Sequence, residues 1–223
     1  MWVKICGVRD EPTAEQICQL APDAIGLNFY RKSARYVTQG VAARISEICR
    51  PAVACVGVFV NHSANEIEEL VNECHLDAVQ VHGDETIESL IEIMGRLPGT
   101  PVYRAWRLSN ESLIDLTAQL SVVQATAARL AGCLIDAPSR VPGEYGGTGQ
   151  TVSWDMVARE YRRETWPKLI LAGGLNPDNV GNAIQIAQPW GVDVASGVES
   201  APGIKDLGKV RQFIQNARGA RVE

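Results

Sequence analysis

Apolar residues recur along the chain in eight short runs that are rich in β-branched residues. The runs begin near Val3, Ala24, Ala54, Ala78, Val102, Cys133, Leu169 and Val192. Residues 53–60 are almost continuously apolar, which is typical of a strand covered on both faces. The stretches between runs show helical spacing instead. One helix face, at i, i+3, i+4 and i+7, is defined by Ile67, Leu70, Val71 and Cys74.

Helix start signals support this alternation. Ser63 and Glu66 are three residues apart before an apolar series, which predicts a capping box. Pro12 and Pro177 fit the first turn of a helix, the latter after an Asn176 cap. The pattern therefore predicts eight strand–helix units.

We predict the α/β class, with these units closed into a single (β/α)8 TIM barrel domain over residues 1–223. No linker, Ser/Gly tract or charge block divides the chain. A doubly wound sheet is the alternative. Such a sheet more often carries G-x-G-x-x-G after its first strand, and that motif is absent.

Composition narrows the functional classes. The chain is 46% hydrophobic, enough for a substantial core, and its formal net charge is -5 with both signs spread along it. It has no basic run with interleaved aromatic residues, so nucleic acid is not an expected partner. Its start lacks a signal-peptide pattern, and its apolar stretches are too short to span a bilayer. We expect a cytoplasmic monomer or homodimer that binds a small molecule.

Six cysteines are present, and none has the spacing of a C-x-x-C pair or of a zinc site with histidine. Without a secretory signal, they should be reduced thiols. The simplest interpretation of five of them is that they are small buried hydrophobic residues on helix faces or in strands. These five are Cys18, Cys49, Cys55, Cys74 and Cys133.

Three features that could take part in a reaction or bind a ligand lie at the ends of predicted strands. Cys6 ends the first run and is followed at once by Gly7, and Asp136 ends the sixth run. Residues 171–177 form a glycine turn before a helix, where backbone N–H groups can bind an anion. Because all barrel strands end at one mouth, these features should lie together and predict an acid/base enzyme for a phosphorylated substrate. The residues expected around this mouth are Cys6, Phe29, Asn61, His82, Trp106, Asp136, Gly173 and Ser196.

Each candidate has a plain structural alternative. Cys6 could be a core thiol, and Asp136 could cap a loop or pair with Arg140. Gln80 and His82 end the fourth run, and both could line the pocket. A lone histidine is as often structural as catalytic, and glycine turns also serve ordinary chain reversal.

The chain resembles the phosphoribosylanthranilate isomerase family in an ordered set of short segments. The first is Lys4-Ile5-Cys6-Gly7. The others are residues 32–36 (KSARY), 56–61 (VGVFVN), 78–85 (AVQVHGDE), 145–149 (YGGTG), 172–180 (AGGLNPDNV) and 192–199 (VDVASGVE). The resemblance covers nearly the whole chain.

This resemblance implies a cofactor-free (β/α)8 isomerase that performs an Amadori rearrangement of N-(5-phosphoribosyl)anthranilate in tryptophan biosynthesis. It implies Asp136 as the acid that opens the sugar ring and Cys6, as a thiolate, as the base that removes the C2 hydrogen. Asp136 then needs a pKa raised by burial, and Cys6 needs a positive neighbour or a helix N-terminus. One acid and one base suffice, so no metal or redox cofactor is expected.

The resemblance also implies binding residues. Arg35 is at the family position that clamps the anthranilate carboxylate, although an ion pair within the protein is its alternative. Asp193 would orient or lock the phosphate loops, and residues 146–149 would form a lid. Phosphate is expected at the turns after strands seven and eight, which contain Gly173, Gly174, Asn176, Ser196 and Gly197.

Two rival functions remain at this point. One is a related sugar-phosphate isomerase of histidine biosynthesis, or a version that accepts both substrates. Those enzymes have a carboxylate where this chain has Cys6. The other is a catalytically silent barrel that binds a phosphorylated ligand as a regulator, and the presence of both Cys6 and Asp136 argues against it.

Overall fold

The computed structural model describes residues 1–107, 113–126, 129–136 and 153–220. The strands of its main sheet are β1 (Trp2–Cys6), β2 (Ala24–Asn28), β3 (Ala54–Phe59), β4 (Ala78–Val81), β5 (Val102–Arg107), β6 (Gly132–Asp136), β7 (Lys168–Leu171) and β8 (Gly191–Val194). Each begins within two residues of the position that the apolar runs predict.

The α-helices alternate with these strands. They are α1 (Glu11–Cys18), α2 (Gln39–Cys49), α3 (Ala64–Glu73), α4 (Ile87–Arg96), α5 (Ile114–Gln124), α6 (Trp154–Glu160), α7 (Val180–Ala187) and α8 (Leu207–Gly219). A short 3-10 helix, η1 (Ser196–Val198), and a small hairpin of β9 (Glu199–Ala201) and β10 (Ile204–Lys205) follow β8.

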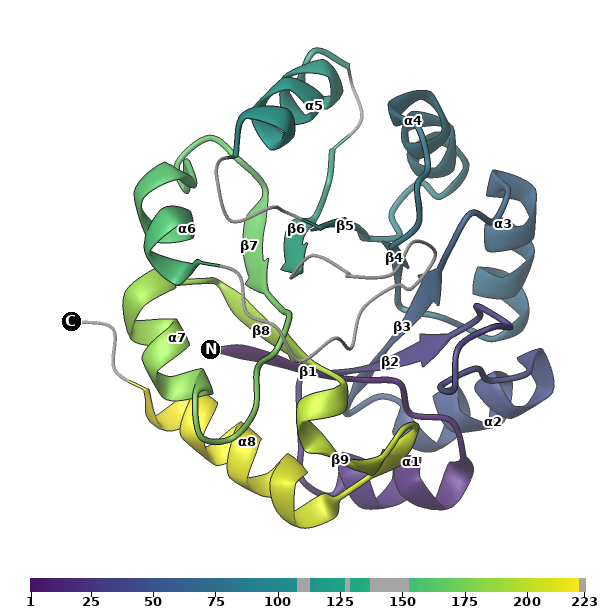
Figure 1. Cartoon of the computed structure of the whole chain (residues 1–223). Helices are drawn as coiled ribbons and strands as arrows, with labels where there is room; N and C mark the ends of the chain where they lie inside the picture. The colour runs from purple at the N-terminus through teal and green to yellow at the C-terminus, as the bar shows by residue number, and fades with distance from the viewer. Residues whose placement is uncertain (108–112, 127–128, 137–152, 221–223) are drawn as a thin grey trace.

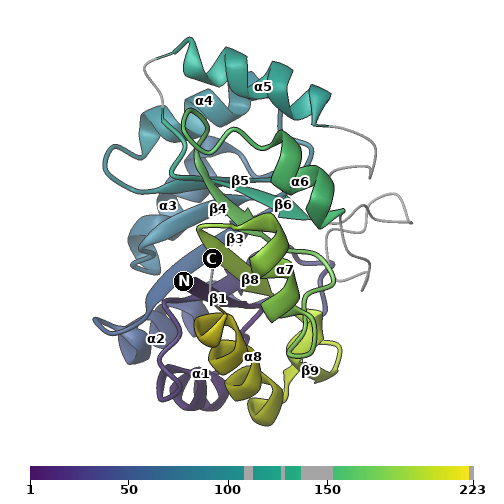
Figure 2. The ribbon, with the colours of Figure 1, turned by 90° about the vertical axis from the view of Figure 1, so that its left-hand side faces the viewer.

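The eight strands of the main sheet form a closed parallel barrel in sequence order, and β8 pairs with β1. Figure 1 shows the strands in the centre and the helices around them, and Figure 2 shows the same arrangement from the side. The predicted (β/α)8 barrel is therefore confirmed. Among the described residues, no helix is long and apolar enough to cross a membrane.

Local sequence signals explain where several helices begin. The Asp10 side chain accepts from the backbone N–H of Thr13 at the start of α1, and Pro12 lies in its first turn. The predicted capping box of Ser63 and Glu66 is present in α3. The predicted start of α7 at Asn176 is wrong, because the helix begins at Val180 after an intervening turn.

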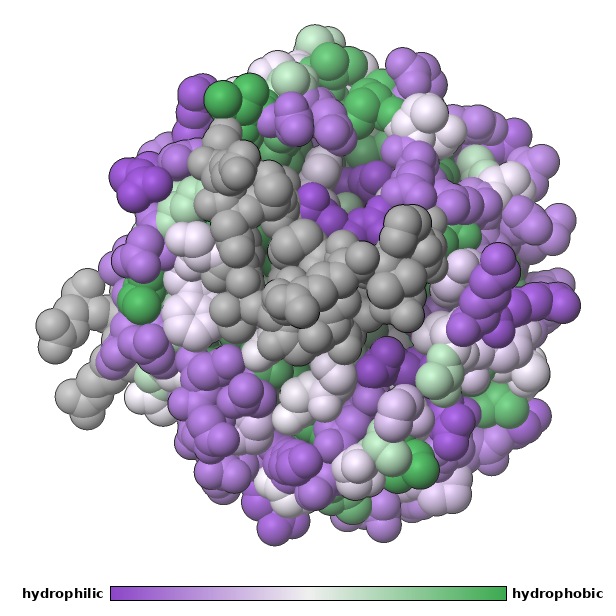
Figure 3. Space-filling view, viewed as in Figure 1, coloured by the Kyte–Doolittle hydropathy of each residue, from purple (hydrophilic) through white to green (hydrophobic). Residues whose placement is uncertain are grey.

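The main core lies between the barrel and its helices, whose outer surface in Figure 3 is largely hydrophilic. Alternate strand residues point into the barrel instead, where small apolar side chains such as Ala105 and Ala172 pack together. Trp106 was expected at the mouth, but its indole N–H donates to Gln119 of α5, 2.9 Å away. The Trp106 side chain therefore faces the helix layer and not the mouth of the barrel, so the expectation that it lies at the mouth is wrong.

Candidate active site

One pocket opens at the carboxyl ends of the strands, where the barrel topology gathers residues from distant parts of the chain. It holds about 550 Å³ of space not filled by protein atoms, including the part open to solvent. The residues that line it are Cys6, Asn28, Arg35, Val58, His82, Asp136, Ala172, Gly173, Gly174, Leu175, Asp193, Val194, Ala195 and Ser196. The structure thus brings most of the predicted site residues together, and we call this space the central pocket.

Cys6 lies above a buried ion pair. Lys4, two residues earlier on the same face of β1, places its Nζ 2.9 Å from Oδ1 of Asp193 on β8. A Cβ built on Gly26 would lie 2.7 Å from Cys6 Sγ and 3.1 Å from Lys4 Nζ. A glycine at this position of β2 therefore leaves the space that the thiol and the ammonium group share.

Burial raises the pKa of the Cys6 thiol above its ordinary value, and the ammonium groups of Lys4 and Lys205 partly oppose this shift. Burial alone would lower the pKa of Lys4, but Asp193 and Cys6 raise it on balance. The positive neighbours that the thiol was predicted to need are therefore two buried lysines.

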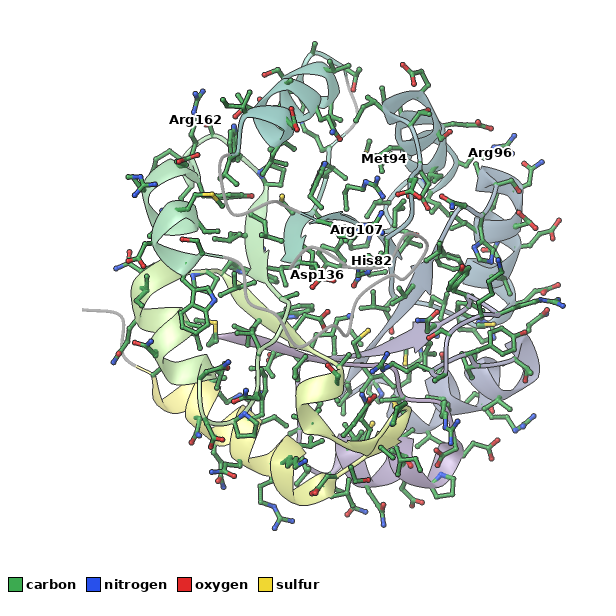
Figure 4. The ribbon with its side chains drawn as sticks, viewed as in Figure 1. His82, Met94, Arg96, Arg107, Asp136 and Arg162 are labelled. Atoms are coloured by element: carbon green, nitrogen blue, oxygen red, sulfur yellow. The ribbon has the colours of Figure 1, made fainter. Side chains whose placement is uncertain are left out.

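Asp136 and His82 are in direct contact at the centre of the barrel, as Figure 4 shows. His82 Nε2 lies 3.2 Å from Oδ2 of Asp136, and its Nδ1 lies 2.9 Å from the Gln80 side-chain nitrogen. Asp136 is 5% exposed, so the burial that its proposed role requires is present. If the Gln80 amide donates to Nδ1, His82 carries its hydrogen on Nε2 and donates to Asp136. Gln80 thus acts behind His82, outside the pocket lining.

Arg35 makes a bidentate ion pair with Glu199. Its Nε and Nη2 lie 2.8 and 2.7 Å from the two carboxylate oxygens, which is the internal pairing considered as its alternative role. Lys205 also donates to Glu199, at 2.7 Å. Among the described residues, the side-chain hydrogen bonds of Arg35 all use Nε and Nη2. Arg35 nevertheless lines the central pocket.

Two turns form the wall of the central pocket beyond β7 and β8. Gly173 and Gly174 have φ angles of 75° and 64°, a left-handed conformation that favours glycine. A Cβ on Gly197 would lie 1.9 Å from the Leu175 carbonyl oxygen, so the turn after β8 packs directly against the turn after β7. This contact holds Ser196 beside the glycine pair.

Asn176 organises the first of these turns. Its side-chain oxygen accepts from the backbone N–H groups of Asp178 and Asn179, at 2.9 and 3.1 Å. The Asn179 side chain in turn donates to the Gly174 carbonyl at 3.0 Å. Asn176 therefore shapes the turn from behind, and neither it nor Gly197 lines the central pocket.

Sequence reasoning assigned no role to Lys4, Glu199 or Lys205. A signal existed for Lys4, because a lysine inside an apolar strand, two residues before the candidate thiol, must share its face. No local pattern joins Glu199 to Arg35, since 164 positions separate them. The proposed lid at 146–149 and the alternative partner Arg140 lie outside the described residues.

Comparison with known proteins gives a consistent result. The family model for N-(5'phosphoribosyl)anthranilate (PRA) isomerase matches residues 3–216. The N-(5'-phosphoribosyl)anthranilate isomerase of Trichlorobacter lovleyi is 41% identical to this chain over 98% of each sequence. That of Thermotoga petrophila is 40% identical over 97% of this chain and 98% of its own length.

Solved structures agree with the sequence relatives. The phosphoribosyl anthranilate isomerase of Thermotoga maritima matches with a TM-score of 0.83 and 36% identity, over 97% of this chain and 98% of its own. A crystal structure of such an isomerase in complex with reduced 1-(o-carboxyphenylamino)-1-deoxyribulose 5-phosphate has a TM-score of 0.80 and 35% identity, with the same coverage.

Proposed function

The chain belongs to the N-(5'-phosphoribosyl)anthranilate isomerase family, and we propose that Cys6 and Asp136 carry out its reaction. The chain is an isomerase of tryptophan biosynthesis that converts N-(5-phosphoribosyl)anthranilate to 1-(2-carboxyphenylamino)-1-deoxyribulose 5-phosphate. The observation that carries the assignment of roles is the central pocket, which a thiol and a buried carboxyl group line together.

The chemistry requires two proton transfers. Protonation of the ring oxygen opens the ribose ring and leaves an iminium ion at C1, which acidifies the hydrogen on C2. A base then removes that hydrogen to give an enolamine, and tautomerisation of the enolamine gives the ketone. An acid and a base in the same pocket are sufficient for this sequence.

Cys6 is the proposed base. Only its thiolate can accept a proton, and burial keeps the free thiol protonated at neutral pH by raising its pKa. Lys4, held by Asp193 beneath the thiol, is a positioning residue that stabilises the thiolate electrostatically. Activity should therefore increase as pH rises toward the ionisation of Cys6.

Replacing Lys4 with Met should move this ascending limb of the kcat/KM profile to higher pH. Without the ammonium group, the desolvated thiolate loses a stabilising charge and the pKa of Cys6 rises further. The measurement is kcat/KM against pH for both proteins. Partial unfolding would lower the whole profile without moving it, so an unmoved limb would show that Lys4 does not assist Cys6.

Asp136 is the proposed acid, and His82 orients it. The contact at 3.2 Å joins His82 Nε2 to Oδ2 of the Asp136 carboxyl group. Gln80 fixes the His82 ring from behind at 2.9 Å. Gln80 thus holds His82, and His82 keeps the carboxyl group of Asp136 in one orientation for proton transfer.

The Arg35 guanidinium is the proposed partner of the anthranilate carboxylate. Glu199 fixes its Nε and Nη2 edge, and the buried ammonium group of Lys205 balances the charge of Glu199. The side chain is thus held in place before the substrate arrives, and its remaining edge can pair with the carboxylate.

Arg35→Met should weaken binding of the reduced product analogue by about 1.5–3 kcal/mol, because it removes a charge-assisted hydrogen bond. Calorimetric titration measures this loss. Arg44→Met is a matched control, since Arg44 forms an exposed ion pair with Glu11 away from the pocket. An analogue without the carboxylate should bind wild type and Arg35→Met equally, and a persistent difference would show that Arg35 does not bind that group.

The turns after β7 and β8 are the proposed phosphate site. Their backbone N–H groups lie at one side of the central pocket, and the packing of Gly197 against Leu175 holds the two turns together. Glycine at 173 and 174 allows the backbone to approach an anion without a side chain between them.

Inorganic phosphate should inhibit competitively and raise the melting temperature of the wild type, because it binds only the folded state. Gly174→Val should abolish this thermal shift. Gly99→Val is a matched control, because Gly99 also has a positive φ angle, of 88°, but lies in the loop between α4 and β5. If phosphate stabilised Gly174→Val as much as the wild type, the anion site would lie elsewhere.

The function is tested by adding the protein to freshly generated N-(5-phosphoribosyl)anthranilate and following the loss of substrate fluorescence. A parallel reaction with the aminoaldose isomerised in histidine biosynthesis distinguishes the closest enzymatic alternative. We expect rapid turnover of the anthranilate substrate and at least tenfold slower turnover of the other. No turnover of either would favour the ligand-binding regulator.

A further inference from the structure

Two thiols meet at the end of the barrel opposite the central pocket. Cys18 is the last residue of α1 and Cys49 is the last residue of α2, and their sulfur atoms are 2.8 Å apart. Cys49 comes shortly before the first residue of β3, Ala54, so the pair lies at the amino ends of the strands. It is therefore on the far side of the barrel from Cys6.

The two thiols differ in access to solvent. Cys18 is half-buried, whereas Cys49 is 1% exposed. This corrects the expectation that Cys18 is a buried hydrophobic residue. A third thiol, Cys55 on β3, is fully buried and interacts with Cys49 from the barrel side.

Cys18 and Cys49 also differ in how readily they ionise. The hydrogen bond between the two sulfur atoms lowers the pKa of Cys18, so the more exposed sulfur of the pair is the one that ionises more readily. A thiolate that solvent can reach, next to a second thiol, is the arrangement in which disulfide formation is fast.

We propose that Cys18 and Cys49 form an oxidisable dithiol pair that closes to a disulfide when a small disulfide oxidant such as oxidised glutathione is present. The Cys18 thiolate attacks one glutathione sulfur, which forms a mixed disulfide and releases one reduced glutathione. Cys49 then loses its proton and attacks the Cys18 sulfur, which releases the second. Two protein thiols are oxidised, and one oxidised glutathione is reduced to two thiols.

Little movement is needed to make the bond, because bonded sulfurs are about 2 Å apart and these two already touch. The new link would join the carboxyl ends of α1 and α2, which are 31 positions apart in the chain. It would restrict the unfolded chain and stabilise the fold, with no direct contact with the central pocket.

The test exposes the native protein to excess oxidised glutathione, alkylates the remaining thiols and maps the peptides by mass spectrometry. We expect a peptide cross-linked between Cys18 and Cys49, lighter by two hydrogens than its reduced parts and separated again by dithiothreitol. The melting temperature of the cross-linked protein should rise by roughly 5 °C or more. Its isomerase activity should stay within twofold of the reduced protein.

Single Cys→Ser variants test which thiols form the cross-link. Cys18→Ser should abolish the cross-link, and this substitution of a half-buried side chain should preserve folding. Cys55→Ser should leave the cross-link intact, and Cys74→Ser serves as a control for a thiol outside the pair. A stable glutathione adduct on Cys18 without a cross-link, a bond between Cys49 and Cys55, or six alkylated thiols after oxidation would each overturn the proposal.

Discussion

Asp136→Asn should lower kcat by roughly 10² to 10⁴-fold, the range that general acid catalysis contributes. The asparagine side chain keeps the size of the aspartate and can still contact His82, but it cannot deliver a proton to the ring oxygen. Ring opening precedes every later step, so its loss blocks the whole reaction. The measurement is the initial rate of fluorescence loss at saturating substrate.

Binding separates this effect from structural damage. Asp136→Asn should bind the reduced product analogue with an affinity close to that of the wild type. Asp155→Asn makes the same chemical change at an exposed position in the first turn of α6 and should retain full activity. If Asp136→Asn kept most of its kcat, the proton for ring opening would have to come from another group.

Cys6→Ala should lower kcat by roughly 10² or more, because it removes the proposed base for the C2 hydrogen. The fold should survive, since the thiol faces a pocket and contributes little packing energy. Lys4 and Asp193 should remain paired beneath the smaller side chain. Circular dichroism and the melting temperature check the fold, and the fluorescence assay measures the rate.

A second thiol provides the control for this variant. Cys133 lies on β6 and is fully buried against the helix layer, so its substitution tests the general effect of removing a strand thiol. Cys133→Ala should lose some stability but keep kcat. A Cys6→Ala protein within threefold of the wild type would exclude Cys6 from the mechanism.

The fold could be predicted from sequence because its signals are local. Apolar runs such as 53–60 identify buried parallel strands, and the capping box at Ser63 marks a helix start within four residues. The start of α7 was misplaced because Asn176 caps a turn with the same side-chain hydrogen bonds that cap a helix. Local chemistry alone does not distinguish these two structures.

The site was predictable only in part. Residues at strand ends, such as Cys6 and Asp136, follow from the rule that all barrel strands open at one face. The residues that contact Cys6 and Asp136 and adjust their chemistry do not follow from this rule. Lys4 and Asp193 are 189 positions apart, and the contact between Cys18 and Cys49 joins two helix ends. The register of neighbouring elements determines which residues form such pairs. Composition and periodicity do not predict this register.

We propose that Cys6 and Asp136 together catalyse the isomerisation in the central pocket. The most direct measurement compares the rate of N-(5-phosphoribosyl)anthranilate fluorescence loss for the wild type and for the double variant Cys6→Ala/Asp136→Asn. The wild-type rate should be proportional to enzyme concentration, whereas the double variant should bind the reduced product analogue without measurable turnover. Turnover by the double variant within tenfold of the wild-type rate would contradict this account of the site.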